Sequence, residues 1–116
     1  IGFQSIKKSH SSACVTMGLS TKYRSKGRGI EATLSLLNFG FKNLNFHRIW
    51  AVTEESNFAV IKLHEIFGFR VEGVLRDYYI KDSKYKNAVI LSCLESEFEI
   101  DKALKSILIL KKINND

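Results

Sequence analysis

Basic residues and glycines gather in one short segment that joins a predicted strand to a predicted helix. Residues 24–29 read Arg-Ser-Lys-Gly-Arg-Gly, and an amphipathic pattern begins at once with Ile30. The first backbone N–H groups of a helix have no partner within the helix, and the helix dipole adds partial positive charge at that end. Glycine lets the backbone approach a bulky anion, and arginine and lysine add full charges for phosphate oxygens. The segment therefore predicts a site that binds a pyrophosphate group.

Two widespread phosphate-binding loops do not fit this segment. A Walker loop ends in Gly-Lys-Ser/Thr, which is missing here. The dinucleotide-binding fingerprint has a different glycine spacing and needs an acidic residue after the next strand. A loop that is basic only for solubility is the remaining alternative.

The spacing of apolar residues predicts the elements on either side of this loop. Residues 1–6 and 12–20 have strand character and flank a polar turn, which favours an antiparallel hairpin. Beyond the loop, apolar residues recur at spacings of three and four, as on one face of a helix. These residues are Ile30, Leu34, Leu37, Phe41 and Leu44.

The rest of the chain alternates between strands and helices. Residues 49–52 are apolar on both faces, which predicts a central strand. Gly68 stands where a helix C-terminus favours a left-handed residue. The expected elements are a strand at 47–53, a helix at 58–67, strands at 69–80 and 86–94, and a helix at 96–112. This order predicts one α/β domain of the α+β mixed kind, built on a mixed sheet.

Composition and charge narrow the classes of function. The net charge of +6 favours anionic partners such as nucleic acid, anionic lipid or a phosphorylated cofactor. No apolar run approaches the ~20 residues of a membrane span, so we expect a cytoplasmic protein with no signal peptide and no membrane partner. The cysteines, Cys14 and Cys93, are expected to be small core residues, and the histidines have no metal-ligand spacing.

Four short motifs, in the right order and spacing, resemble the GCN5-related N-acetyltransferases, the GNAT family. Residues 24–29 match the family signature Gln/Arg-x-x-Gly-x-Gly/Ala at every defined position. Residues 44–48 resemble the "Leu-x-x-His-Arg" strand entry, and residues 72–76 resemble the "Glu-Gly-x-x-Arg" strand. Asn57, followed by a short helix and Gly-Phe at 68–69, completes the set. The similar branch acetylates ribosomal protein N-termini, polyamines and aminosugars.

The resemblance implies a fold and an acyl donor. A central, mostly antiparallel sheet would splay open between the family's fourth and fifth strands, and the pantetheine arm of acetyl-CoA would enter there. The backbone at Met17 and Gly18 would then lie near the oxyanion that develops during transfer. The implied contacts with acetyl-CoA come from Met17, Gly18, Leu19, Arg24, Ser25, Lys26, Gly27, Arg28, Gly29, Ile30, Asn57 and Lys62.

Two positions depart from the family pattern. His64 stands seven residues after Asn57, where many members carry a tyrosine that protonates the departing thiolate. A histidine there either keeps that catalytic role or is a buried helix residue with a structural hydrogen bond. Cys14 stands where the branch often has a glutamate, which leaves the general base open between a water chain, Glu54 and Glu55.

The family's first strand, first two helices and second strand have no counterpart here, so the acceptor site is expected to be incomplete. We expect residues 1–98 to form an acetyl-CoA-binding N-acetyltransferase domain that is incomplete at its N-terminal side. Residues 99–116 are expected to add a C-terminal helical extension with its lysines on a solvated face. A homodimer stays open.

The favoured function is transfer of the acetyl group of acetyl-CoA to a primary amine by direct attack. The acceptor stays open between a protein N-terminus, a polyamine and an aminosugar. A catalytically degenerate module that binds a CoA ester is the alternative, which the replacements at His64 and Cys14 favour. Nucleic-acid binding is a weaker interpretation, because the basic residues lie beside glycines rather than among exposed aromatic residues.

Overall fold

The computed structural model of the chain describes residues 2–16 and 28–115. The chain starts with a hairpin of β1 (Gly2–Lys7) and β2 (Ser12–Thr16), which are joined by the 3-10 helix η1 (Lys8–His10). The predicted second strand is confirmed as far as Thr16, and its expected continuation lies outside the described residues.

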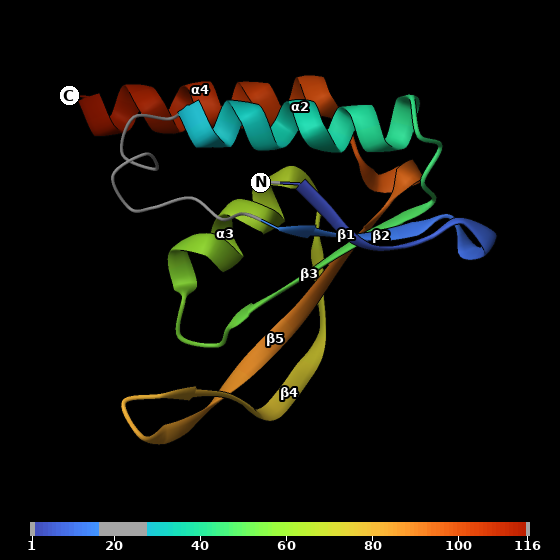
Figure 1. Cartoon of the computed structure of the whole chain (residues 1–116). Coiled ribbons are helices and arrows are strands. Elements are labelled where there is room, and N and C mark those ends of the chain that lie inside the picture. The colour runs from blue at the N-terminus through green and yellow to red at the C-terminus, as the bar shows by residue number, and fades with distance from the viewer. Residues whose placement is uncertain (1, 17–27, 116) are drawn as a thin grey trace.

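The order of elements agrees with the sequence prediction (Figure 1). The hairpin is followed by α2 (Arg28–Lys42), β3 (Arg48–Glu54), α3 (Phe58–Phe67), β4 (Arg70–Lys81), β5 (Lys84–Leu94), the 3-10 helix η2 (Glu95–Glu97) and α4 (Ile100–Asn115). The sheet order is β1-β2-β3-β5-β4. The β2–β3 pair is parallel and the other neighbouring pairs are antiparallel. The expected mixed, mostly antiparallel sheet with a central β3 is therefore confirmed.

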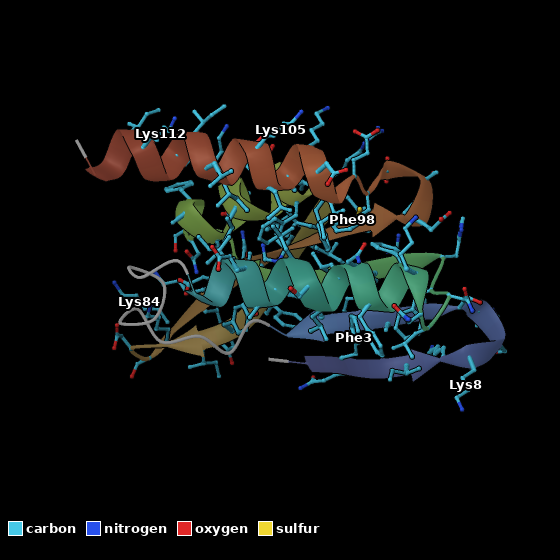
Figure 2. All side chains as sticks on the ribbon, turned by 90° about the horizontal axis from the view of Figure 1, so that it is seen from above. Phe3, Lys8, Lys84, Phe98, Lys105 and Lys112 are labelled. Carbon is cyan, nitrogen blue, oxygen red and sulfur yellow. The ribbon has the colours of Figure 1, made fainter. Side chains whose placement is uncertain are left out.

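One face of the sheet packs against α2, α3 and α4. The views from the side and from above show α2 and α4 lying side by side over the strands (Figures 1 and 2). The core formed there includes Ala13, Ile49 and Leu91 from the sheet and Leu34, Phe67 and Ile107 from the helices. Burying this apolar surface is the main force that holds the helices on the sheet.

The last helix differs from its predicted form. Glu97 accepts a hydrogen bond from the backbone N–H of Leu94 at 3.0 Å, which closes a 3-10 turn before α4 begins at Ile100. Ala103 and Ile107 enter the core, whereas the apolar side chains of Leu104 and Leu108 are 37% and 58% exposed. Their position follows from α4 meeting α2 and α3 along a narrow contact. The division into 1–98 and 99–116 stays a prediction.

The hairpin of β4 and β5 extends beyond the end of β3 (Figure 1). Pairing between β3 and β5 stops at Glu54 and Ala88, while β5 continues to its start at Lys84. The hairpin turns at Asp82 and Ser83, which have φ angles of 53° and 62°. Two successive positive φ values produce the twist that a two-residue hairpin turn requires.

Two of the motif residues meet on the sheet. The guanidinium of Arg48 on β3 donates a hydrogen bond to the carboxylate of Glu72 on β4, reaching across β5. Hydrogen bonds from Arg48 and then from Ser92 hold the pKa of Glu72 below its usual value. One residue of the "His-Arg" motif and one residue of the "Glu-Gly" motif therefore form an ion pair that reaches across three strands.

Candidate functional site

The parallel strands β2 and β3 part halfway along their length. Their pairing runs from Ser12 and Arg48 to Cys14 and Trp50. Beyond that point β3 continues to Glu54 beside β5, whereas β2 continues beside β1. The sheet is therefore open between its second and third strands, as the family resemblance implied.

A cavity of about 400 Å³ lies at this opening. Four strands and α3 contribute to its wall. The lining residues are Gln4, Ser5, Cys14, Val15, Trp50, Ala51, Val52, Thr53, Asn57, Val60, His64 and Tyr78. None of these side chains carries a permanent charge, and the polar ones offer amides, hydroxyls, a thiol and an imidazole. Such a wall suits a neutral ligand that combines apolar segments with hydrogen-bonding groups.

Asn57 belongs both to this wall and to the start of α3. Its side-chain oxygen accepts a hydrogen bond from the backbone N–H of Val60 at 3.4 Å, as an N-cap residue does. The oxygen is therefore engaged in the cap, which leaves the amide NH₂ group to act as a donor. The structure thus brings Asn57 to the cavity, and its contact with acetyl-CoA stays a prediction.

His64 lies in the last turn of α3 and is only 2% exposed. Its Nδ1 lies 2.8 Å from the backbone oxygen of Val60. A carbonyl oxygen only accepts hydrogen bonds, so Nδ1 must carry the ring hydrogen. Nε2 is then the unprotonated nitrogen of the neutral ring, and it is buried without a hydrogen-bond partner among the described residues.

The surroundings of His64 favour this neutral form. The rings of Phe67 and Phe69 stand edge-on to the imidazole, with centroids 6.1 and 5.1 Å away. Burial lowers the pKa of His64, and the hydrogen bond to Val60 opposes that shift to a smaller extent. A buried imidazole without a nearby counter-ion is neutral at pH 7.

The candidates for the general base have different positions. Cys14 lies in the cavity wall, but burial raises the pKa of its thiol, which keeps it protonated at neutral pH. Glu54 accepts a hydrogen bond from Ser56 and forms an ion pair with Lys81 at 3.5 Å. Neither Glu54 nor Glu55 is among the residues that line the cavity. The described structure thus brings no ionised carboxylate to the opening between the strands.

Only some of the other residues predicted to contact acetyl-CoA lie within the described part of the chain. Met17, Gly18, Leu19, Arg24, Ser25, Lys26 and Gly27 lie outside the described residues. Arg28 opens α2, and Gly29 and Ile30 follow in its first turn. Lys62 is exposed on α3 and does not line the cavity. The helix start that the phosphate prediction requires is therefore present, while the loop before it stays a prediction.

Two aromatic residues of the cavity wall were not predicted from the sequence. Trp50 is half-buried on the face of β3 opposite the helix-covered core, and the apolar character of β3 on both faces was the signal for a second buried surface. Tyr78 lies on the protruding hairpin and reaches the cavity through the fold of that hairpin. No local pattern in the sequence marks Tyr78.

The described residues contain no cluster of three or more potential metal ligands. Within the same part of the chain, no helix has both the length and the apolar character to span a membrane.

Comparisons with known proteins agree with this geometry. Residues 1–70 match the family described as Acetyltransferase (GNAT) domain. The chain is 33% identical over 97 residues to an uncharacterized N-acetyltransferase, p20, from Bacillus licheniformis, a match that covers 84% of this chain and 54% of the relative. It is 25% identical over 80 residues to spermidine N(1)-acetyltransferase of Escherichia coli K12, covering 69% of this chain and 43% of that protein.

A solved structure shows the same fold. The spermidine/spermine N-acetyltransferase SpeG from Vibrio cholerae superposes with a TM-score of 0.76 at 24% identity, over 81% of this chain and 55% of that one. The chain thus spans about half the length of the relatives and the solved structure that it matches.

Proposed function

This chain belongs to the acetyltransferase (GNAT) domain family, and from that membership we propose that it transfers the acetyl group of acetyl-CoA to a primary amine. The observation that carries the proposal is the cavity at the parting of β2 and β3. The strand β2, two of whose residues line this cavity, precedes α2 along the chain, and the sequence predicts the pyrophosphate site at the start of α2.

The cavity fits the middle of an acetyl-CoA molecule. The pantetheine arm is uncharged and alternates amides with short apolar segments, and the described wall has no permanent charge. The buried Nε2 of His64 has no hydrogen-bond partner among the described residues, and the N-cap bond of Asn57 uses only its side-chain oxygen and leaves its NH₂ group as a donor. Both groups therefore offer unused hydrogen-bonding capacity. When bound, acetyl-CoA supplies an activated acetyl thioester whose carbonyl carbon a neutral amine attacks.

Each region of the chain then has a distinct task. The backbone at Met17, Gly18 and Leu19 pairs with the pantetheine arm, and the loop at 24–29 with Ile30 holds the pyrophosphate. Asn57 donates to the arm from the start of α3, and Lys62 on the same helix contacts a phosphate at the exposed end. His64 is the catalytic residue within the described wall.

The acceptor is a primary amine, and a polyamine is the first candidate to test. Relatives of this chain carry the name spermidine N-acetyltransferase, which supports that choice. A protein N-terminal amine and an aminosugar are the other candidates. The test is an acceptor panel of spermidine, an alanine-terminated peptide and glucosamine, with release of free thiol from acetyl-CoA as the readout.

A module that binds a CoA ester without turnover is the second candidate function. The specific observation in its favour is that the described cavity wall carries neither a tyrosine at position 64 nor an ionised carboxylate. Acetyl-CoA binding without thiol release for any amine in the panel would favour this module over the enzyme.

Calorimetric titration of acetyl-CoA into the chain tests the proposal directly. We expect micromolar binding by the natural sequence and loss of that binding in the double variant Gly27→Glu with Arg28→Glu. The matched control is Lys105→Glu with Leu108→Glu, which changes the net charge equally on the exposed face of α4. Lys105 and Leu108 are both exposed side chains of α4. No binding by the folded natural chain, or equal losses in both double variants, would refute the assigned site.

A further inference from the structure

The C-terminal helix α4 buries only part of its apolar surface. Ala103 and Ile107 enter the core, whereas three other large apolar side chains of the helix are mostly exposed. These are Leu108 at 58%, Ile109 at 60% and Ile113 at 65%. Single exposed apolar residues are common on protein surfaces, but several gathered on one helix mark a surface that binds another molecule.

Lysines stand between these apolar residues. Lys102, Lys105, Ile109 and Lys112 follow one another at spacings of three, four and three, which places them on one side of the helix. Ile113 lies one turn after Ile109, and all of these side chains are exposed. This outer face of α4, made of the three lysines and the two isoleucines, therefore combines positive charge with bulky aliphatic groups.

The charges of the outer face are available to a partner. Among the described residues, no ion pair involves a lysine of this face. The sequence from 102 to 115 contains no aspartate or glutamate, and the last acidic residue before it is Asp101 in the first turn of α4. The net charge of +6 reinforces the attraction of this surface for anions.

We propose that α4 docks the protein on a membrane surface rich in anionic lipid, with the helix parallel to the bilayer plane and its outer face against the headgroups. Ile109 and Ile113 enter the boundary between headgroups and acyl chains, and the lysines extend to the lipid phosphates. The inference is independent of acetyl transfer, because the described wall of the cavity between β2 and β3 contains no residue of α4.

This inference differs from the expectation of no membrane partner. That expectation rested on the lack of an apolar run long enough to span a bilayer, and the described helices include no such span. A helix that lies in the interface needs no such run, because it combines exposed apolar side chains with basic ones instead. The exposed surface of α4 has this combination.

Two other occupants fit the outer face less well. A second copy of the chain would oppose lysines with lysines over much of the contact, since residues 102–115 supply no carboxylate. Nucleic acid would cover Ile109 and Ile113 with phosphates, and neither side chain offers an aromatic ring on which a base could stack. A bilayer accommodates both the charges and the aliphatic groups.

Co-sedimentation of the folded chain with sucrose-loaded vesicles measures the docking. One set of vesicles contains equal parts of phosphatidylglycerol and phosphatidylcholine, and the other contains phosphatidylcholine alone. We expect binding to the anionic set, at least about tenfold weaker binding to the neutral set, and release when NaCl is raised from about 0.05 to about 0.5 M. Equal binding to both sets, or binding to neither, would overturn the proposal.

A charge-reversal pair tests whether α4 is the docking element. Lys105→Glu with Lys112→Glu should weaken binding to the anionic vesicles at least about tenfold. The matched control, Lys84→Glu with Lys86→Glu, makes the same change of net charge at exposed positions of the β4–β5 hairpin. The tip of that hairpin lies on the opposite side of the molecule from α4 (Figure 1), so the control should bind within about threefold of the natural chain. Equal losses in the two variants would mean attraction by net charge alone and would refute the role of α4.

The aliphatic groups are tested by Ile109→Gln with Ile113→Gln. Glutamine retains helix propensity and the net charge, so circular dichroism should be unchanged while binding to the anionic vesicles falls at least about fivefold. Unchanged binding would contradict the insertion of α4. Sedimentation velocity without lipid identifies the competing occupant: a dimer that this variant dissociates, together with no vesicle binding by the natural chain, would assign the face to a second copy.

Discussion

Substitution of Gly68 by alanine provides the sharpest test of how α3 is held. Gly68 ends the helix with a φ of 105°, and the backbone N–H groups of Gly68 and Phe69 bond back to the last turn. A side chain at this φ strains the backbone by about 1–2 kcal/mol. The position matters for function because the same helix carries Asn57 and His64.

A second cost comes from the surroundings of the new methyl group. A Cβ at position 68 would lie 3.0 Å from the backbone oxygen of Glu97 and 3.5 Å from Cys93 Sγ. The Glu97 backbone yields little, because its side chain bonds to the N–H of Leu94 and to Arg70 at 2.9 Å. Together the strain and the contact predict a loss of about 2–3 kcal/mol in the free energy of unfolding.

Urea unfolding followed by circular dichroism measures this loss, and thermal unfolding should show a midpoint lowered by roughly 8–12 °C. The matched control is Gly73→Ala on β4, where an added Cβ meets no heavy atom within 4 Å. That variant should stay within about 0.5 kcal/mol of the natural chain. Equal stability of the two variants would refute the argument from φ and contact at Gly68.

Three further predictions concern the residues of the candidate site. Asn57→Ala should lower the free energy of unfolding by about 0.5–1 kcal/mol by removing the N-cap, whereas Asn57→Asp should retain stability. Both variants lose the amide donor and should weaken acetyl-CoA binding at least about fivefold in calorimetry. Unchanged affinity would count against the place of Asn57 in the cavity. Because burial lowers the pKa of His64, the unfolded chain binds more protons below about pH 6.5, and the free energy of unfolding should fall as the pH drops from about 6.5 towards the lowered pKa. His64→Gln should flatten this dependence in urea titrations, and an unchanged slope would contradict the assignment. Burial raises the pKa of Cys93 to about 12, so iodoacetamide at pH 8 should label the less buried Cys14 first, as peptide mass mapping would show; labelling at equal rates would speak against the described burial.

The sequence predicted most elements because each has a local signal. The stripe from Ile30 to Phe41 follows the helical period, and Asn57 and Gly68 mark the two ends of α3 by their capping chemistry. The boundary at α4 was less predictable, because the 3-10 turn before it depends on the hydrogen bond between Glu97 and Leu94. The local sequence does not distinguish this 3-10 turn from a helix that starts at residue 96.

Some residues of the candidate site were likewise predictable from the local sequence, and others only from the fold. Asn57 and His64 were singled out by the family resemblance, which compares residues at fixed positions within one short segment and so uses local information. Trp50 and Tyr78 join them only when the sheet order brings β3 and the β4–β5 hairpin to the same opening. Pairing between distant strands depends on contacts across the whole sheet, which a single window of residues does not contain.

The sequence by itself determined the residue types, the order of elements, the basic glycine loop before α2 and the family resemblance. The tertiary structure decided where β2 and β3 part, which side chains line the cavity between them, and that Arg48 pairs with Glu72. It also decided the state of His64, because the hydrogen bond to Val60 and the packing of Phe69 set which ring nitrogen is free. Protonation responds to burial and to the three-dimensional arrangement of partners, so the same histidine in an exposed turn would be a different chemical group.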